Sequence, residues 1–251
     1  MCGWVLKIVK RGERVLIVCG TGNNGGDGLA IARILQLKGY TVDTVLLGDD
    51  KKGTEQNKKQ QEILCAYGMP VYKEIPEERE YQMVVDAIFG VGLTRKIEGI
   101  YRNVIEKMNT LSGCKIAIDI PSGVSADDGA VLGLAFYADK TITFAFDKIG
   151  LHLWPGNVAA GEVIVKEIGI TERSFLDRKP MVAAMDDADL AYLMSRPSHA
   201  NKGTFGKLLI IAGSINMAGA AVLAGKSAYA AGGGLVRILT PEENRVIIQT
   251  A

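Results

Sequence analysis

The sequence predicts an α/β protein, a Rossmann-like three-layer αβα sandwich built around a mostly parallel sheet. Three observations support this fold class. Short apolar runs alternate with stretches of helical periodicity, a glycine-rich segment follows the first apolar run, and polar residues come directly after several of these runs. Alternating strands and helices are typical of doubly wound sheets, whose ligands bind at the carboxyl ends of the strands.

The elements are expected in the following order. The apolar run 15–19 predicts a buried strand, and the helical spacing of 29–38 predicts a helix after it. A second strand is expected at 41–47, and the lysine-rich stretch 51–61 begins a helix that ends near Gly68. Four more strands are predicted from β-branched and apolar runs, at 83–89, 115–119, 140–146 and 162–166.

The glycine-rich segment Gly20–Gly28 is the most informative part of the chain. It has glycine at positions 20, 22, 25, 26 and 28, and we expect it to form a loop between the first strand and the first helix. Such a loop brings backbone N–H groups close to an anion at a helix N-terminus. Its Gly20-x-Gly22-x-x-Gly25 pattern is a weak dinucleotide signal by itself. Asn23, Asn24 and Asp27 add donors and acceptors, although an Asn-rich tight turn would explain them too.

Three segments are expected to meet at one edge of the sheet. They are residues 20–28, Asp86 with residues 90–96, and Asp119 with Ser122. Each follows or ends a predicted parallel strand. Because the carboxyl ends of such strands share an edge, we expect a single site there.

Composition narrows the function classes. The 251-residue chain has 48% hydrophobic and 23% charged residues, as ordinary globular proteins do. Its 29 Lys and Arg nearly equal its 28 Asp and Glu, which gives no support for a nucleic-acid or anionic-membrane partner. Four cysteines without a CxxC pair, and only two histidines, provide neither a zinc site nor a disulfide framework, so a reducing, cytoplasmic setting is expected.

A second strand–loop–helix unit is predicted near the C-terminus. Residues 172–199 are polar and indicate a linker with a short helix, and residues 202–239 then repeat the strand, glycine loop, helix and strand pattern. The uncharged stretch 208–225 is long enough for a membrane span. Turn-forming residues at 213–216 divide it, and we interpret it as a strand, a loop and a helix.

Three motifs carry a resemblance to a known family. Gly22-Asn-Asn-Gly-Gly-Asp-Gly28, Val85-Asp-Ala-Ile-Phe-Gly-Val-Gly92 and Ala117-Ile-Asp-Ile-Pro-Ser-Gly123 together resemble the NAD(P)H-hydrate epimerase domain. Lys202-Gly-Thr-Phe-Gly206 and the segment 212–220 resemble the start of the ribokinase-like NAD(P)H-hydrate dehydratase domain. The chain is thus similar to bifunctional nicotinamide nucleotide repair enzymes.

The resemblance implies an activity. Reduced nicotinamide cofactors become hydrated at ring carbon 6, giving R and S epimers of NADHX and NADPHX. The epimerase interconverts the two, and the dehydratase removes water from the S form with the help of ADP or ATP. The resemblance thus implies an isomerase acting on a small molecule, with one potassium ion per epimerase site; a homo-oligomer is left open.

The resemblance also implies which residues form the site. It makes Asp119 a substrate contact, and Asn24, Asp86 and Ser122 the potassium ligands. The catalytic role is assigned to Asp119 because a carboxylate at a strand end can move a proton. The remaining substrate contacts that the resemblance implies are Asn23, Asn24, Gly25, Gly26, Asp27, Gly90, Val91, Gly92, Leu93, Thr94, Arg95 and Lys96.

The chemistry of the residues agrees with these assignments, with an alternative for each. Asp119 at a strand end can give and take a proton, or can cap the loop before Pro121. Asp86 in an apolar strand needs a partner, either a cation bound through oxygens or the amides of the glycine-rich segment. Arg95 and Lys96 can pair with phosphates or stay solvated. Lys148 is one further candidate contact, and His152 is interpreted as non-catalytic.

The expected domains are 1–175, an N-terminally shortened epimerase domain, and 176–251, a linker with the incomplete N-terminal part of a dehydratase domain. The family's epimerase has a longer N-terminal region, and its dehydratase nucleotide contacts lie beyond Ala251. We therefore expect no dehydratase activity, and a need for ADP or ATP only in an intact dehydratase domain.

Two other functions compete with the isomerase. An NAD-dependent oxidoreductase should have an acidic residue at the end of the second strand to hold the ribose, and Asp43, Asp49 and Asp50 fit that position poorly. A non-catalytic nucleotide-binding module would use the same loops. Replacing Asp119 by Asn separates catalysis from binding.

Overall fold

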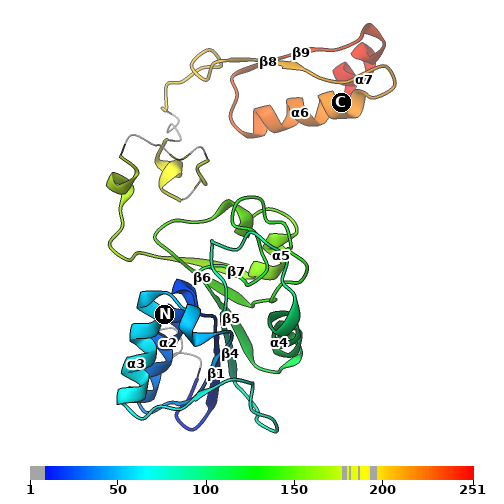
Figure 1. Ribbon diagram of the computed structural model, residues 1–251. Helices are drawn as coiled ribbons and strands as arrows, with labels where there is room; N and C mark the ends of the chain where they lie inside the picture. Colours follow the sequence, from blue (N-terminus) through cyan, green and yellow to red (C-terminus); the bar gives the residue numbers. More distant parts are fainter. Residues whose placement is uncertain (1–8, 177–179, 181, 186, 193–196) are drawn as a thin grey trace. The chain divides into compact units, whose positions relative to one another are not determined.

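The computed structural model describes residues 9–176, 180, 182–185, 187–192 and 197–251. The chain divides into two compact units, residues 1–182 and 183–251. Figure 1 shows the strands of the first unit gathered in one sheet flanked by helices.

Within the part of the chain that the structure describes, the sheet of the first unit has seven strands in the order β3-β2-β1-β4-β5-β6-β7, and every neighbouring pair is parallel. This arrangement confirms the predicted Rossmann-like fold. Strand order reverses between β1 and β4, where Cys19 is paired with Ala87. The strands are β1 (Arg14–Cys19), β2 (Thr41–Leu46), β3 (Val71–Tyr72), β4 (Met83–Ala87), β5 (Cys114–Ile118), β6 (Lys140–Phe144) and β7 (Glu162–Lys166).

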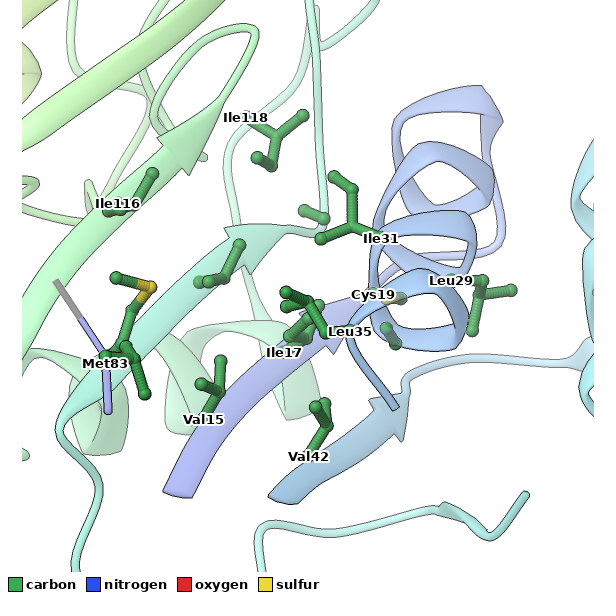
Figure 2. Close-up of a cluster of buried hydrophobic side chains, with 14 of the residues drawn as sticks. Val15, Ile17, Cys19, Leu29, Ile31, Leu35, Val42, Met83, Ile116 and Ile118 are labelled. Carbon is green, nitrogen blue, oxygen red and sulfur yellow. The ribbon is translucent and has the colours of Figure 1, made fainter. Parts of the chain in front are cut away.

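Helices cover both faces of this sheet, because successive side chains of each strand point to opposite sides. In β1, Val15, Ile17 and Cys19 pack under α2 in one apolar cluster, shown in Figure 2. Leu16 and Val18 belong to a second cluster that includes residues of α4. The α-helices found in the described residues of this unit are α2 (Asn23–Leu37), α3 (Glu55–Ala66), α4 (Gly99–Thr110) and the short α5 (Gly156–Ala160).

The glycine-rich segment differs from the prediction. Helix α2 begins at Asn23 rather than near Leu29, so Gly25, Gly26 and Gly28 are helical and only Gly20–Gly22 is loop. None of these glycines has a positive φ. A Cβ on Gly25 would lie 1.7 Å from the Gly20 carbonyl oxygen, and a Cβ on Gly28 would lie 2.5 Å from the Cβ of Ala87. Glycine is required at positions 25 and 28 because α2 packs directly against its own loop and against the sheet. A left-handed turn is not the reason, since neither position has a positive φ.

The second unit contains the predicted strand–loop–helix–strand pattern. Strands β8 (Lys207–Ile211) and β9 (Leu235–Leu239) are parallel neighbours, and α6 (Ala218–Ala230) connects them. Helix α7 (Arg245–Thr250) follows. The uncharged stretch 208–225 is therefore divided between β8 and α6, and no helix in the described parts of the chain has the length and apolar character to cross a membrane.

Candidate active site

A cavity of about 530 Å³ lies at the carboxyl edge of the sheet, where β1 and β4 end side by side. Its wall is built from the segment after β1, the segment after β4, and single residues from α4 and the end of β5. The lining residues are Thr21, Gly22, Asn23, Asn24, Asp27, Ile88, Phe89, Gly90, Val91, Gly92, Leu93, Thr94, Arg95, Tyr101 and Asp119. This is the topological switch point of the sheet, where open α/β sheets bind ligands.

The loop after β1 is held in place from α3. The Asn57 side-chain amide, fully buried, donates hydrogen bonds to the carbonyl oxygens of Gly20 (3.0 Å) and Gly22 (2.9 Å). The backbone N–H of Thr54 donates to the Thr21 carbonyl at 3.0 Å. Gly22 caps α2 without a side-chain hydrogen bond, so the positive end of the helix faces the cavity.

Asp86 joins the segments that follow β4 and β5. Its fully buried carboxylate accepts hydrogen bonds from the backbone N–H and the hydroxyl of Ser122, both at 2.7 Å, and from the N–H of Ile88 at 3.1 Å. The amides of the glycine-rich segment, an alternative raised by the sequence, are not its partners. Burial raises the pKa of Asp86 to about 6, although the hydrogen bonds from Ser122 and Ile88 act in the opposite direction.

Asn24 presents an unpartnered oxygen beside this network. Its side-chain nitrogen donates to the Phe89 carbonyl at 2.8 Å, whereas its buried Oδ1 has no hydrogen-bond partner within the described residues. The Ser122 hydroxyl accepts from the N–H of Phe89 at 2.9 Å, so the same turn contacts both side chains. A buried amide oxygen, a hydroxyl and a carboxylate are hard oxygen donors of the kind that bind alkali and alkaline-earth cations, and the donor set fits such an ion.

Asp119 follows β5 with an unusual backbone. Its φ of +65° is in the left-handed region, which Asp tolerates better than most residues. Oδ1 of its carboxylate pairs with Lys148 Nζ at 2.8 Å and accepts from the Thr143 hydroxyl at 3.2 Å. The carboxylate is therefore bound by side chains from and after β6, and no backbone N–H in the loop before Pro121 holds it.

A second carboxylate, Asp27, lines the same cavity from the first turns of α2. Desolvation raises its pKa, and the negative charge of Asp119 raises it further. The two carboxylates are thus electrostatically coupled. Asp119 has a cationic partner in Lys148, whereas Asp27 has no ion-pair partner among the described residues.

The structure brings most of the predicted substrate contacts together. Asn23, Asn24, Asp27, Asp119 and all of 90–95 line the cavity. Gly25 and Gly26 are buried inside α2, and Lys96 is exposed outside the cavity lining. Asp86 and Ser122 are fully buried and are not part of the lining surface.

Several residues of the site were not predicted. Phe89 and Tyr101 line the cavity as a ring pair with centroids 5.0 Å apart. Asn57 on α3 and Thr143 on β6 do not line the cavity. Asn57 binds the loop after β1, and the Thr143 hydroxyl donates to Asp119. Of these four residues, only Phe89 had a signal in the sequence, because it lies within the motif Val85–Gly92. Tyr101, Asn57 and Thr143 become neighbours of the site through tertiary packing.

Asp43 gives evidence against a dinucleotide-type ribose contact. It lies inside β2, buried, and pairs with Arg14 at 3.1 Å and Arg79 at 2.8 Å. It also accepts a hydrogen bond from the Tyr81 hydroxyl at 3.0 Å. A carboxylate committed to these three groups is unavailable to a ribose.

The fold and the cavity define the first unit as a Rossmann-like α/β domain with a cavity at the topological switch point of its sheet. Residues 1–150 match the family described as YjeF-related protein N-terminus. The chain belongs to this family. Residues 208–251 match the family described as NAD(P)H-hydrate dehydratase.

Individual relatives agree with the family. The chain is 45% identical over 158 residues to the NAD(P)H-hydrate epimerase of Levilactobacillus brevis, covering 63% of this chain and 74% of that protein. It is 39% identical over 233 residues to the bifunctional NAD(P)H-hydrate repair enzyme Nnr of Thermofilum pendens, covering 89% of this chain but 44% of that enzyme. The crystal structure of yeast YNL200c shares the fold, with a TM-score of 0.51 and 24% identity over 62% of this chain and 66% of that one.

Proposed function

We propose that this chain is an NAD(P)H-hydrate epimerase, which interconverts the R and S forms of NADHX and NADPHX. The observation that carries the proposal is a family match over residues 1–150 whose three motifs all contribute to one cavity or to the network beside it. A cavity of about 530 Å³ is within the range of small-molecule sites. The name of the L. brevis relative describes the same activity.

The proposed chemistry requires one group that moves a proton. Carbon 6 of the hydrate is a hemiaminal carbon, so its inversion requires loss and regain of planarity through departure of the hydroxyl or opening of the ring. A carboxylate in a partly enclosed cavity can act as general base and then as general acid. We assign this role to Asp119, which lines the cavity at the end of β5.

The rest of the cavity would bind the substrate. The N-terminus of α2 and the guanidinium of Arg95 are suited to the phosphates of the hydrate. Phe89 and Tyr101 offer aromatic surface for one of its rings.

A potassium ion is part of the proposal. The residues that would hold it are Asn24, through its unpartnered Oδ1, Asp86 and Ser122. When bound, such a cation supplies positive charge beside the buried carboxylate of Asp86. The need for ADP or ATP is proposed only for an intact dehydratase domain.

A coupled assay tests the function. The purified chain is mixed with R-NADHX, an intact S-specific dehydratase and its nucleotide, and NADH recovery is followed by absorbance. We expect recovery faster than spontaneous epimerisation, and its loss in Asp119→Asn with retained ligand binding. Asp187→Asn, an exposed aspartate of the second unit, is the matched control. A wild-type rate equal to the spontaneous one, from a folded chain that binds the hydrate, would instead indicate a non-catalytic binding module.

A further inference from the structure

The side chain of Lys148 is fully used within the protein. Its ammonium group has three N–H donors. They are directed to Asp119 Oδ1 at 2.8 Å, Thr143 Oγ1 at 2.7 Å and the Phe144 carbonyl at 2.8 Å. The side chain is only 18% exposed and does not line the cavity. Lys148 is therefore satisfied without a ligand, which argues against a direct contact with substrate phosphates.

The two oxygens of Asp119 have different surroundings. Oδ1 receives both Lys148 and Thr143, whereas Oδ2 has no hydrogen-bond partner within the parts of the chain that the structure describes. Oδ2 is turned toward the loop after β4, because a Cβ built on Gly90 would lie 3.3 Å from it. Gly90 itself lines the cavity. One oxygen is thus anchored in the protein, and the other is directed to the site.

The groups around Asp119 are themselves held by burial and hydrogen bonding. Thr143 is fully buried on β6, and the N–H of Asp119 donates to the carbonyl of the preceding β6 residue, Ile142, at 2.8 Å. The left-handed backbone of Asp119 fixes the direction in which its side chain leaves the chain. Strain of this kind persists where surrounding contacts over-determine it. The carboxylate is held through both its backbone and Oδ1.

We infer that Lys148, together with Thr143, is a positioning residue that anchors Oδ1 of Asp119 so that Oδ2 is the oxygen that exchanges the proton. The inference rests on the proposed epimerase function. It assigns no substrate contact to Lys148. Its prediction is that losing the ammonium lowers turnover while substrate affinity stays nearly constant, since the cavity wall itself is unchanged.

Four variants test the inference in the coupled R-NADHX assay. Lys148→Met removes the charge at similar length, Lys148→Arg keeps it, and Thr143→Val removes one hydroxyl at constant shape. Lys38→Met, an exposed lysine at the opposite end of α2, is the control. We expect Lys148→Met to lower kcat by about 100-fold, the size of effect that misplacing a catalytic group by about 1 Å produces. KM should change less than about threefold, Lys148→Arg should recover much of the loss, and Thr143→Val should lose about tenfold.

The outcomes separate the two proposals. An inactive wild-type chain overturns both, whereas an active wild type with an unchanged kcat in Lys148→Met overturns the role of Lys148 alone. A rise in KM without a fall in kcat would make Lys148 a substrate-binding residue and also overturn the inference. Circular dichroism confirms that each variant is folded. If Lys148→Met does not fold, an unchanged kcat in Thr143→Val overturns the anchoring argument by itself.

Discussion

Asp86 should make the stability of the first unit fall as the pH rises. In the unfolded chain this carboxyl ionises near its ordinary value of 3.8, whereas burial raises its pKa in the folded chain to about 6. Between these values the folded state binds more protons than the unfolded state, so the free energy of unfolding decreases with pH. The stabilisation is fully present below pH 3.8 and is lost as the pH rises through 6.

The size of the effect follows from the pKa. Each pKa unit is worth about 1.4 kcal/mol, so the two ionisation equilibria differ by about 3 kcal/mol. Carboxylates whose pKa is lowered by folding, such as Asp128, contribute with the opposite sign. The comparison with Asp86→Asn isolates the contribution of the single buried group, because the variant retains all other titrations.

The assay is urea denaturation between pH 4.5 and 7.5 in potassium-free buffer, followed by far-UV circular dichroism. Because Asp86 belongs to the first unit, a difference between wild type and Asp86→Asn is assigned to the unfolding of that unit. We expect wild type to lose about 2 kcal/mol more than Asp86→Asn over this range, because the rest of the effect falls below pH 4.5. Replacing N-methylglucamine by potassium at pH 7.5 should restore part of the loss in wild type only. Parallel pH profiles for the two proteins would refute the reasoning.

Three further predictions concern packing and binding. Gly28→Ala should lower the free energy of unfolding by about 1–3 kcal/mol, because the added methyl group overlaps buried atoms. Gly219→Ala lies on a helix with open space around it, and it should raise the free energy of unfolding by up to about 1 kcal/mol. The midpoints of urea denaturation test both expectations. Asn57→Ala should cost about 1–3 kcal/mol in the same measurement by removing the buried hydrogen bonds that Asn57 donates to the carbonyls of Gly20 and Gly22. Arg95→Ala should raise KM for R-NADHX about tenfold, whereas Lys96→Ala should leave KM unchanged, because of these two residues only Arg95 lines the cavity. Equal effects of the two substitutions on KM would contradict this expectation.

The sheet was predictable because its strands are buried on both faces. Runs such as 15–19 and 83–85 are continuously apolar, a pattern that short helices seldom share. Strand β3 has only two residues, and α4 has few buried positions, so neither produced a clear signal. The start of α2 was misplaced because glycine is a poor helix former, and its value for close packing depends on residues distant in the sequence.

The site was predictable where it follows strands directly. Asn24, Asp27, Arg95 and Asp119 are close to strand ends, and parallel topology brings such positions together. The residues that support the site without lining the cavity could not be predicted in this way. Asn57 lies on a helix more than thirty residues after the loop that it holds, and nothing in its local sequence distinguishes it from a solvated asparagine.

The pairing of β1 with β4 has a consequence for the order of events during folding. The two halves of the cavity wall are brought together by strands whose paired residues, such as Cys19 and Ala87, are far apart in the chain. The binding surface therefore does not exist in a nascent chain until β4 has emerged and joined the sheet. A ligand that touches both halves binds only the assembled sheet, and by mass action it draws late folding intermediates toward the native state. A nonreactive substrate analogue present during refolding should thus raise the yield of active protein.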